Sequence, residues 1–124
     1  MRHFDHLTAT AAARLFHLPP QPFTADDDNA VLALALGATL YSPATRPTLM
    51  KDLARQRTAG VLSVVVCLED AIADADVTAA ERNAVAQLRD YAATEPDGPL
   101  LFIRVRAPEQ IPAIVAGLGP RPCS

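Results

Sequence analysis

Aromatic residues are scarce in this sequence, and tryptophan is absent. Phe and Tyr make up 5% of the 124 residues, whereas half of all residues are hydrophobic. A core built from this composition must consist mainly of Ala, Val, Leu and Ile, the usual content of α/β layers. The length is that of one ordinary domain.

The sequence also lacks an excess of positive charge. The formal net charge is −3, and no basic stripe with interleaved aromatic residues compensates for it. Nucleic-acid binding, which depends on neutralising phosphates, is therefore not expected.

Thiol and imidazole groups are few. Cys67 lies in an apolar run and Cys123 is the next-to-last residue, so we expect one buried and one loose thiol, with no disulfide framework. His3, His6 and His17 all lie near the N-terminus. They are interpreted as surface or capping histidines, with a metal site as the minor alternative.

Long hydrophobic runs and nucleotide motifs are missing as well. The longest apolar stretch, 61–68, is far below the ~20 residues that span a bilayer. Residues 1–20 contain no apolar core of a secretory signal, so a cytoplasmic location without membrane contact is predicted. No glycine-rich phosphate loop follows any expected strand, and no Ser-His-Asp or Cys-His arrangement is evident.

Three prolines between Leu15 and Phe23 forbid a continuous helix there. We expect residues 1–23 to form an extended, Pro-rich lead-in across another surface, anchored by Phe16, Leu18 and Phe23. Residues 24–124 then form the domain proper.

Helical and strand patterns alternate from residue 24 onward. The predicted helices cover 31–36, 47–58, 78–93 and 108–118, and the predicted strands cover 38–42, 61–68 and 100–105. Thr24 with Asp27 and Thr78 with Glu81 are capping-box candidates, and residues 95–98 suit a turn. The alternation indicates βαβ units around a parallel sheet, either a barrel or an open doubly wound sheet.

Chemistry in such folds lies at the carboxyl ends of the strands. Glu69 and Asp70 follow the most apolar strand, and adjacent side chains there face opposite ways, so one could enter the site while the other braces a loop. Such carboxylates suit Mg²⁺ or water bound to it. The alternative is that Asp70 caps the loop and Glu69 is solvated.

Two arginines follow the third strand. Arg104 and Arg106 are two residues apart, so on a strand they share a face and could grip a carboxylate substrate or pair with Glu69 or Asp70. The alternative is exposure to solvent at a fraying strand end.

Three runs together resemble a known family. Residues 40–44 (LYSPA), 68–71 (LEDA) and 104–106 (RVR) are similar to the first three strand ends of the citrate lyase beta-subunit-like family, which belongs with the HpcH/HpaI aldolases. The resemblance implies a (β/α)8 TIM barrel and Mg²⁺-dependent cleavage or formation of a carbon–carbon bond next to a carbonyl. The implied substrates are 2-oxo acids or CoA thioesters.

The resemblance also implies residue roles. Arg104 and Glu69 would be catalytic, Arg104 and Arg106 would bind substrate, and Glu69 and Asp70 would bind the metal through water. The sequence departs from the family at four positions, where an Arg, an Asp, a Lys and an Asn are replaced by Gly37, Cys67, Thr78 and Arg106, respectively. These departures predict a substrate other than that of citrate lyase, without the usual recognition of CoA.

A barrel takes about 250 residues, so we expect only its N-terminal part: an α/β fold of three β/α units after the lead-in and a helix. The family's direct metal ligands have no counterpart here, so the chain alone is not expected to be active. The alternative hypothesis is a small α/β binding or regulatory module that associates with itself or a partner through an open sheet edge. Assembly of a complete enzyme from several copies is the least favoured.

Overall fold

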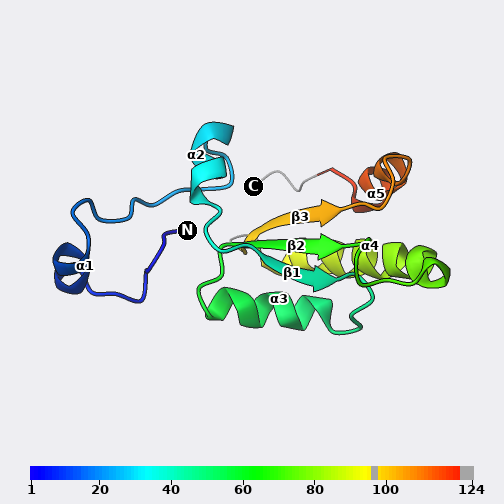
Figure 1. Cartoon of the computed structure of the whole chain (residues 1–124), viewed down its shortest axis with the longest axis horizontal. Helices are drawn as coiled ribbons and strands as arrows, with labels where there is room; N and C mark the ends of the chain where they lie inside the picture. Colours follow the sequence, from blue (N-terminus) through cyan, green and yellow to red (C-terminus); the bar gives the residue numbers. More distant parts are fainter. Residues whose placement is uncertain (96–97, 121–124) are drawn as a thin grey trace.

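A computed structural model describes residues 1–95 and 98–120 of the chain (Figure 1). The elements, in chain order, are α1 (Ala9–Leu15), α2 (Asn29–Ala35), β1 (Leu40–Pro43), α3 (Leu49–Thr58), β2 (Ser63–Cys67), the 3-10 turn η1 (Asp74–Asp76), α4 (Val77–Thr94), β3 (Leu100–Arg104) and α5 (Gln110–Leu118). Among the described residues, none of the helices has both the length and the hydrophobicity needed to traverse a bilayer.

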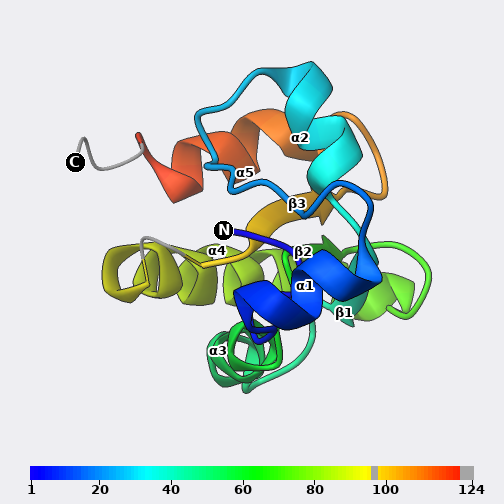
Figure 2. The same cartoon turned by 90° about the vertical axis from the view of Figure 1, so that its left-hand side faces the viewer.

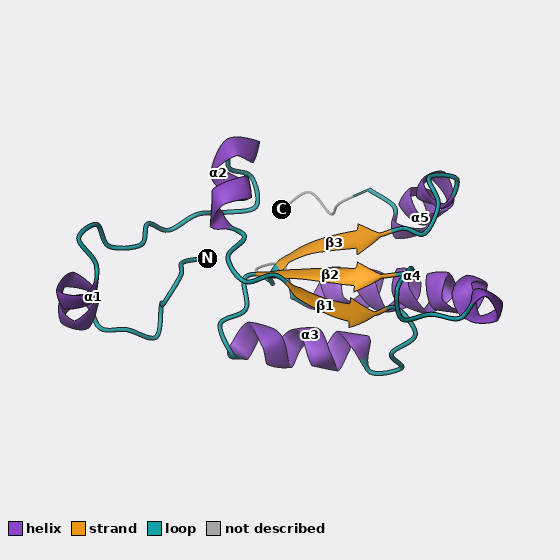
Figure 3. Cartoon of the chain, viewed as in Figure 1, coloured by secondary structure: helices purple, strands orange, loops and turns teal. Residues whose placement is uncertain are grey.

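The three strands form one parallel sheet in the order β1-β2-β3, as predicted (Figure 3). The register pairs Tyr41 with Val65 and Val65 with Phe102, so these three side chains form a row on one face of the sheet. Val64 and Val66 belong to the opposite face and are fully buried there. Each connection between strands carries a helix, as parallel pairing requires.

Helices α3, α4 and α5 all lie along one side of the sheet (Figure 2). They share a single core with β2, to which Leu53 from α3, Leu88 from α4 and Ile114 from α5 contribute. Sequential strands with every crossover on one side are the arrangement of a (β/α) barrel and not of a doubly wound sheet. The fold is therefore α/β, a partial barrel whose sheet is not closed, and the prediction of fold class is confirmed.

Several local predictions were wrong. The lead-in 1–23 is not extended throughout, because Ala9–Leu15 forms α1 behind an N-cap at Thr8 whose hydroxyl accepts from Ala11 N–H. Asp28, not Thr24, caps α2, since its carboxylate lies closer to the helix start and accepts from Ala30 N–H.

The second capping-box candidate was also wrong. Helix α4 begins at Val77, so Thr78 lies within the helix, and its N-cap Asp76 makes no side-chain capping bond. The η1 turn directly precedes α4, so the chain enters this helix from a 3-10 turn and not through a capping box. The predicted turn at 95–98 and the end of the chain include residues 96–97 and 121–124, which lie outside the described residues.

The N-terminal segment lies beyond the amino ends of the strands, near α2 (Figure 1). The N-terminal ammonium of Met1 donates to the Phe23 carbonyl at 2.7 Å, and Phe23 N–H donates back to Met1 O at 2.8 Å. Phe23 is buried, which confirms it as an anchor, whereas Leu18 is 80% exposed and is not one. His3 Nε2 hydrogen-bonds to the Ala35 carbonyl at 2.9 Å, at the end of α2.

Candidate functional site at the carboxyl ends of the strands

The face of the sheet turned away from the helices is open. Tyr41 is 60% exposed and Phe102 is 43% exposed, although both lie on strands. With Val65 between them they line a shallow apolar cleft that ends at Arg104. In a closed barrel this face would point inward. The cleft therefore combines an apolar floor with one cation at the carboxyl end of β3.

Two carboxylates hold the guanidinium of Arg104. Its Nε lies 2.5 Å from Glu69 Oε2, and its Nη1 donates to Asp70 Oδ2 at 2.7 Å. The predicted pairing of Arg104 with Glu69 or Asp70 is thus confirmed, and both residues take part. The expectation that the two adjacent carboxylates face opposite ways was wrong, because β2 ends at Cys67 and the strand alternation does not extend to them.

Charge and burial act in opposite directions on Arg104. Burial lowers the pKa of Arg104, but the negative charges of Asp70 and Glu69 raise it, with smaller contributions from Cys67 and Tyr41, and the net shift is upward. Arg104 therefore stays protonated at any physiological pH. It is a fixed positive charge, suited to binding anions and not to exchanging protons.

Arg106 holds the loop that follows β2. Its Nη2 donates to the backbone carbonyl oxygens of Glu69, at 3.0 Å, and Ile72, and its Nη1 pairs with Asp74. The strand ends at Arg104, so the predicted sharing of one strand face does not extend to Arg106. Because Arg106 binds the carbonyl of Glu69 and that of Ile72, it holds the backbone on either side of Asp70 and so fixes the loop that presents both carboxylates. Its predicted contact with substrate remains a prediction.

The loop after β1 is held by two amides that sequence reasoning missed. Asn83 Nδ2 donates to the carbonyl oxygens of Ala44, at 2.7 Å, and Arg46, at 3.0 Å. Gln87 Nε2 also donates to Arg46 O, and Gln87 Oε1 accepts from Met50 N–H at 2.9 Å. The available signal was an Asn and a Gln four residues apart on a helix, next to its apolar stripe.

The acidic and thiol side chains of this site do not by themselves form a metal centre. Within 1–95 and 98–120, no group of three His, Cys, Asp or Glu side chains is placed to hold a metal ion. Glu69 and Asp70 are both engaged by Arg104, and Asp74 by Arg106. Cys67 is buried, as predicted, but its sulfur accepts from Glu69 N–H at 3.4 Å. The described residues therefore do not fit a directly ligated Mg²⁺, which needs several oxygen ligands in octahedral geometry.

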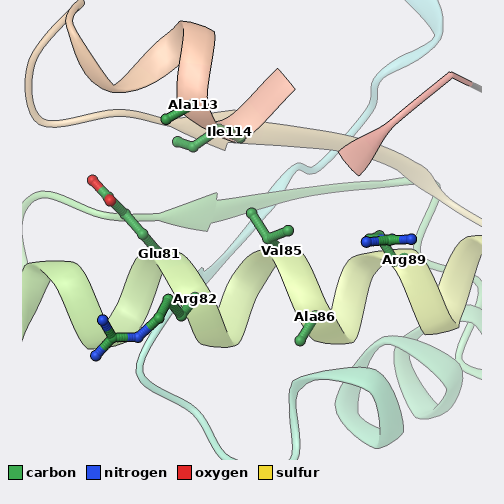
Figure 4. Close-up of a pocket in the computed structure, with 7 residues that line it drawn as sticks. All are labelled: Glu81, Arg82, Val85, Ala86, Arg89, Ala113 and Ile114. Carbon is green, nitrogen blue, oxygen red and sulfur yellow. The ribbon is translucent and has the colours of Figure 1, made fainter. Parts of the chain in front are cut away.

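A second shallow groove lies on the outer side of the helical layer, between α4 and α5 (Figure 4). Val85 and Ile114 line it, together with Arg82 and Arg89 from α4. Gly117 makes the close approach of the two helices possible, because a Cβ atom there would lie 2.9 Å from Val85 Cγ1. The groove therefore follows the line along which α4 and α5 pack against each other.

The fold and the site together define the protein class. Parallel strands, helices on one side, and charged residues at the carboxyl ends of β2 and β3 are the arrangement of (β/α) barrels. The family model of carbon–carbon bond lyases of the TIM-barrel fold matches residues 30–122. The chain belongs to this family, and its domain is partial. Neither the curated proteins nor the solved structures contain a match to this chain.

Proposed function

We propose that this chain supplies the anion-binding part of a carbon–carbon lyase site that acts on a 2-oxo acid or an acyl-CoA type substrate. The observation that carries the proposal is the position of Arg104: a permanently charged, pre-oriented guanidinium at the carboxyl end of β3, next to an apolar cleft. Membership of the lyase family supports the reaction class.

The chemistry follows from what such a group stabilises. When a carbon–carbon bond next to a carbonyl breaks, its electron pair moves toward the carbonyl, whose oxygen becomes an enolate oxygen. N–H donors that are already in place stabilise the developing charge without reorganisation. The same guanidinium suits a substrate carboxylate, because its donors match two carboxylate oxygens. Glu69 acts in this proposal by holding the guanidinium through Nε.

We propose that this chain contacts magnesium only through water. Glu69 and Asp70 would contact water molecules of the ion, and its direct ligands would come from strands other than β1, β2 and β3. The charge distribution supports this, because the carboxylates in the loop after β2 outnumber the two arginines that hold them. An isothermal titration with MgCl₂ tests it: we expect no saturable binding below about 1 mM to this chain alone. Tight binding would contradict it.

The experiment on Arg104 uses pyruvate as a small 2-oxo acid. Wild-type chain and Arg104→Gln are titrated with pyruvate and followed by ¹H–¹⁵N NMR. We expect shifts around Tyr41, Phe102 and Arg104 in the wild type, and a loss of affinity of about tenfold or more in the variant, since a charge-assisted hydrogen-bond pair is removed.

The matched control is Arg89→Gln, which removes the same charge from the groove between α4 and α5, away from the carboxyl ends of the strands (Figure 4). Its affinity for pyruvate should equal that of the wild type. If Arg104→Gln binds as well as Arg89→Gln, Arg104 is not the anion site and the proposed function fails.

The open face also supports a partner of the same fold. We propose that further β/α units cover the row Tyr41, Val65 and Phe102, because this face points inward in a closed barrel. The β3 edge, with alternate backbone groups turned outward, would pair with a further strand. Light scattering and amide hydrogen exchange test this. A monodisperse monomer with slowly exchanging β3 amides would favour the alternative of a self-contained binding module.

A further inference from the structure

We propose that Asp70 is an exchangeable counter-ion of Arg104, whose place an incoming substrate carboxylate takes. This proposal rests on the proposed function and adds to it a determinant of affinity. The Nε atom of Arg104 pairs with Glu69, and its Nη1 atom donates to Asp70. Among the residues that the structure describes, Nη2 has no partner. Departure of Asp70 would free the Nη1–Nη2 edge, where a carboxylate binds through both oxygens.

Exposure and anchoring distinguish the two carboxylates. The Asp70 side chain is 66% exposed, whereas that of Glu69 is 38% exposed. Glu69 is also held through its backbone, because its carbonyl accepts from Arg106 and its N–H donates to Cys67 Sγ. An exposed carboxylate regains water when it leaves an ion pair, so its release costs little. Asp70 is therefore the residue that leaves, and Glu69 keeps the guanidinium in place.

Charge balance favours exchange over addition. The cluster contains two arginines, Arg104 and Arg106, and three carboxylates, Glu69, Asp70 and Asp74. A further anion added to it would increase an existing excess of negative charge. An anion that takes the place of Asp70 keeps two carboxylates against the guanidinium of Arg104, while the exposed Asp70 carboxylate turns out into solvent. Because Arg106 holds the carbonyls of Glu69 and Ile72, only the side chain of Asp70 needs to rotate.

The test compares pyruvate affinity among variants of the full chain at fixed ionic strength. Asp70→Asn removes the competing charge, and we expect it to bind pyruvate about twofold to fivefold more tightly than the wild type. Asp70→Ser should act the same way and guards against an effect specific to the amide. Asp74→Asn is the control: it removes an equal charge from the same loop, but that carboxylate pairs with Arg106 and is 99% exposed.

The outcomes separate this proposal from the proposed function. Tighter binding in both Asp70 variants and not in Asp74→Asn supports exchange. Equal tightening in Asp74→Asn means a general charge effect and overturns it, as does unchanged or weaker binding in the Asp70 variants. If Arg104→Gln has no effect on pyruvate binding, the proposed function fails, whatever the Asp70 variants do. No binding by the wild type or by Asp70→Asn overturns both.

Discussion

The side chain of Asn83, in the middle of α4, donates to the backbone carbonyl of Ala44 at 2.7 Å. Ala44 is the residue that follows β1, and it is fully buried. A helix between β2 and β3 therefore fixes the loop at the carboxyl end of β1. This contact joins the helical layer to the edge of the sheet where the charged residues gather.

Asn83→Ala should destabilise the protein by about 1–3 kcal/mol, because it leaves the buried carbonyl of Ala44 without its donor. Urea unfolding followed by circular dichroism measures this. Arg82→Ala, an exposed neighbour on the same helix, is the control and should change stability by less than about 0.5 kcal/mol. Equal effects of the two substitutions would show that the hydrogen bond to Ala44 contributes nothing.

The contact of Asp52 with Arg46 should contribute to the free energy of unfolding at neutral pH, and this contribution should be lost in acid. The hydrogen bond from Arg46, at 2.6 Å, lowers the pKa of Asp52; burial opposes this, and Thr48 adds to it. Because the pKa in the folded state lies below that in the unfolded state, the stabilisation is present above the ordinary carboxyl pKa. It is lost as pH falls through the lowered value.

Unfolding midpoints between about pH 2 and pH 6 should therefore fall more steeply with acid in the wild type than in Asp52→Asn. Asp90→Asn, which removes an exposed carboxylate of α4, is the control and should retain the wild-type slope. Parallel curves for the wild type and Asp52→Asn would contradict the role of the Arg46 pair.

Tyr91 carries a buried hydroxyl with no hydrogen-bond partner among the described residues. Tyr91→Phe should leave stability at pH 7 unchanged or raise it by up to about 1 kcal/mol, because an unsatisfied polar group is removed from the core. Thermal unfolding measures this, with Leu88→Ala as the control for loss of packing in the same core. A loss above about 1 kcal/mol in Tyr91→Phe would show that the hydroxyl has a partner.

The buried hydroxyl of Tyr91 should also make the stability of the fold fall at alkaline pH. Burial raises the pKa of Tyr91, Glu95 adds to the shift, and Arg57 opposes it. The raised pKa means that stability is complete below the ordinary tyrosine pKa of about 10 and declines as pH rises above it. Tyr91→Phe should remove this decline, as stability measurements between about pH 8 and pH 11 would show.

Gly37 adopts φ +62°, and a Cβ atom there would lie 2.5 Å from His3 Cε1. Gly37→Ala should cost about 1 kcal/mol or more and displace His3 from the end of α2, exposing residues 1–23 to limited proteolysis. Gly60→Ala is the matched control: its φ is +84°, but nothing lies within 4 Å of an added Cβ. Equal proteolysis of the two variants would show that His3 does not hold the segment.

Part of the site could be predicted from the sequence. The apolar run around Val64 and Val66 identified a buried parallel strand, and Glu69 and Asp70 directly follow it. The meeting of these carboxylates with Arg104 followed from the rule that parallel strands end at one edge. Their common attachment to one guanidinium did not, because it depends on how the loop turns after Cys67.

Local pattern determined what depends on neighbours in sequence: the alternation of strands and helices, the parallel sheet, the buried Cys67 and the family to which the chain belongs. Only the tertiary structure decided that Arg106 donates hydrogen bonds to the carbonyls of Glu69 and Ile72. The same is true of the hydrogen bond from Asn83 to the carbonyl of Ala44. These contacts join residues more than 30 positions apart. Their partners are backbone atoms, which every residue carries, so no side-chain pattern marks them, and only the packed geometry selects which carbonyl is bound.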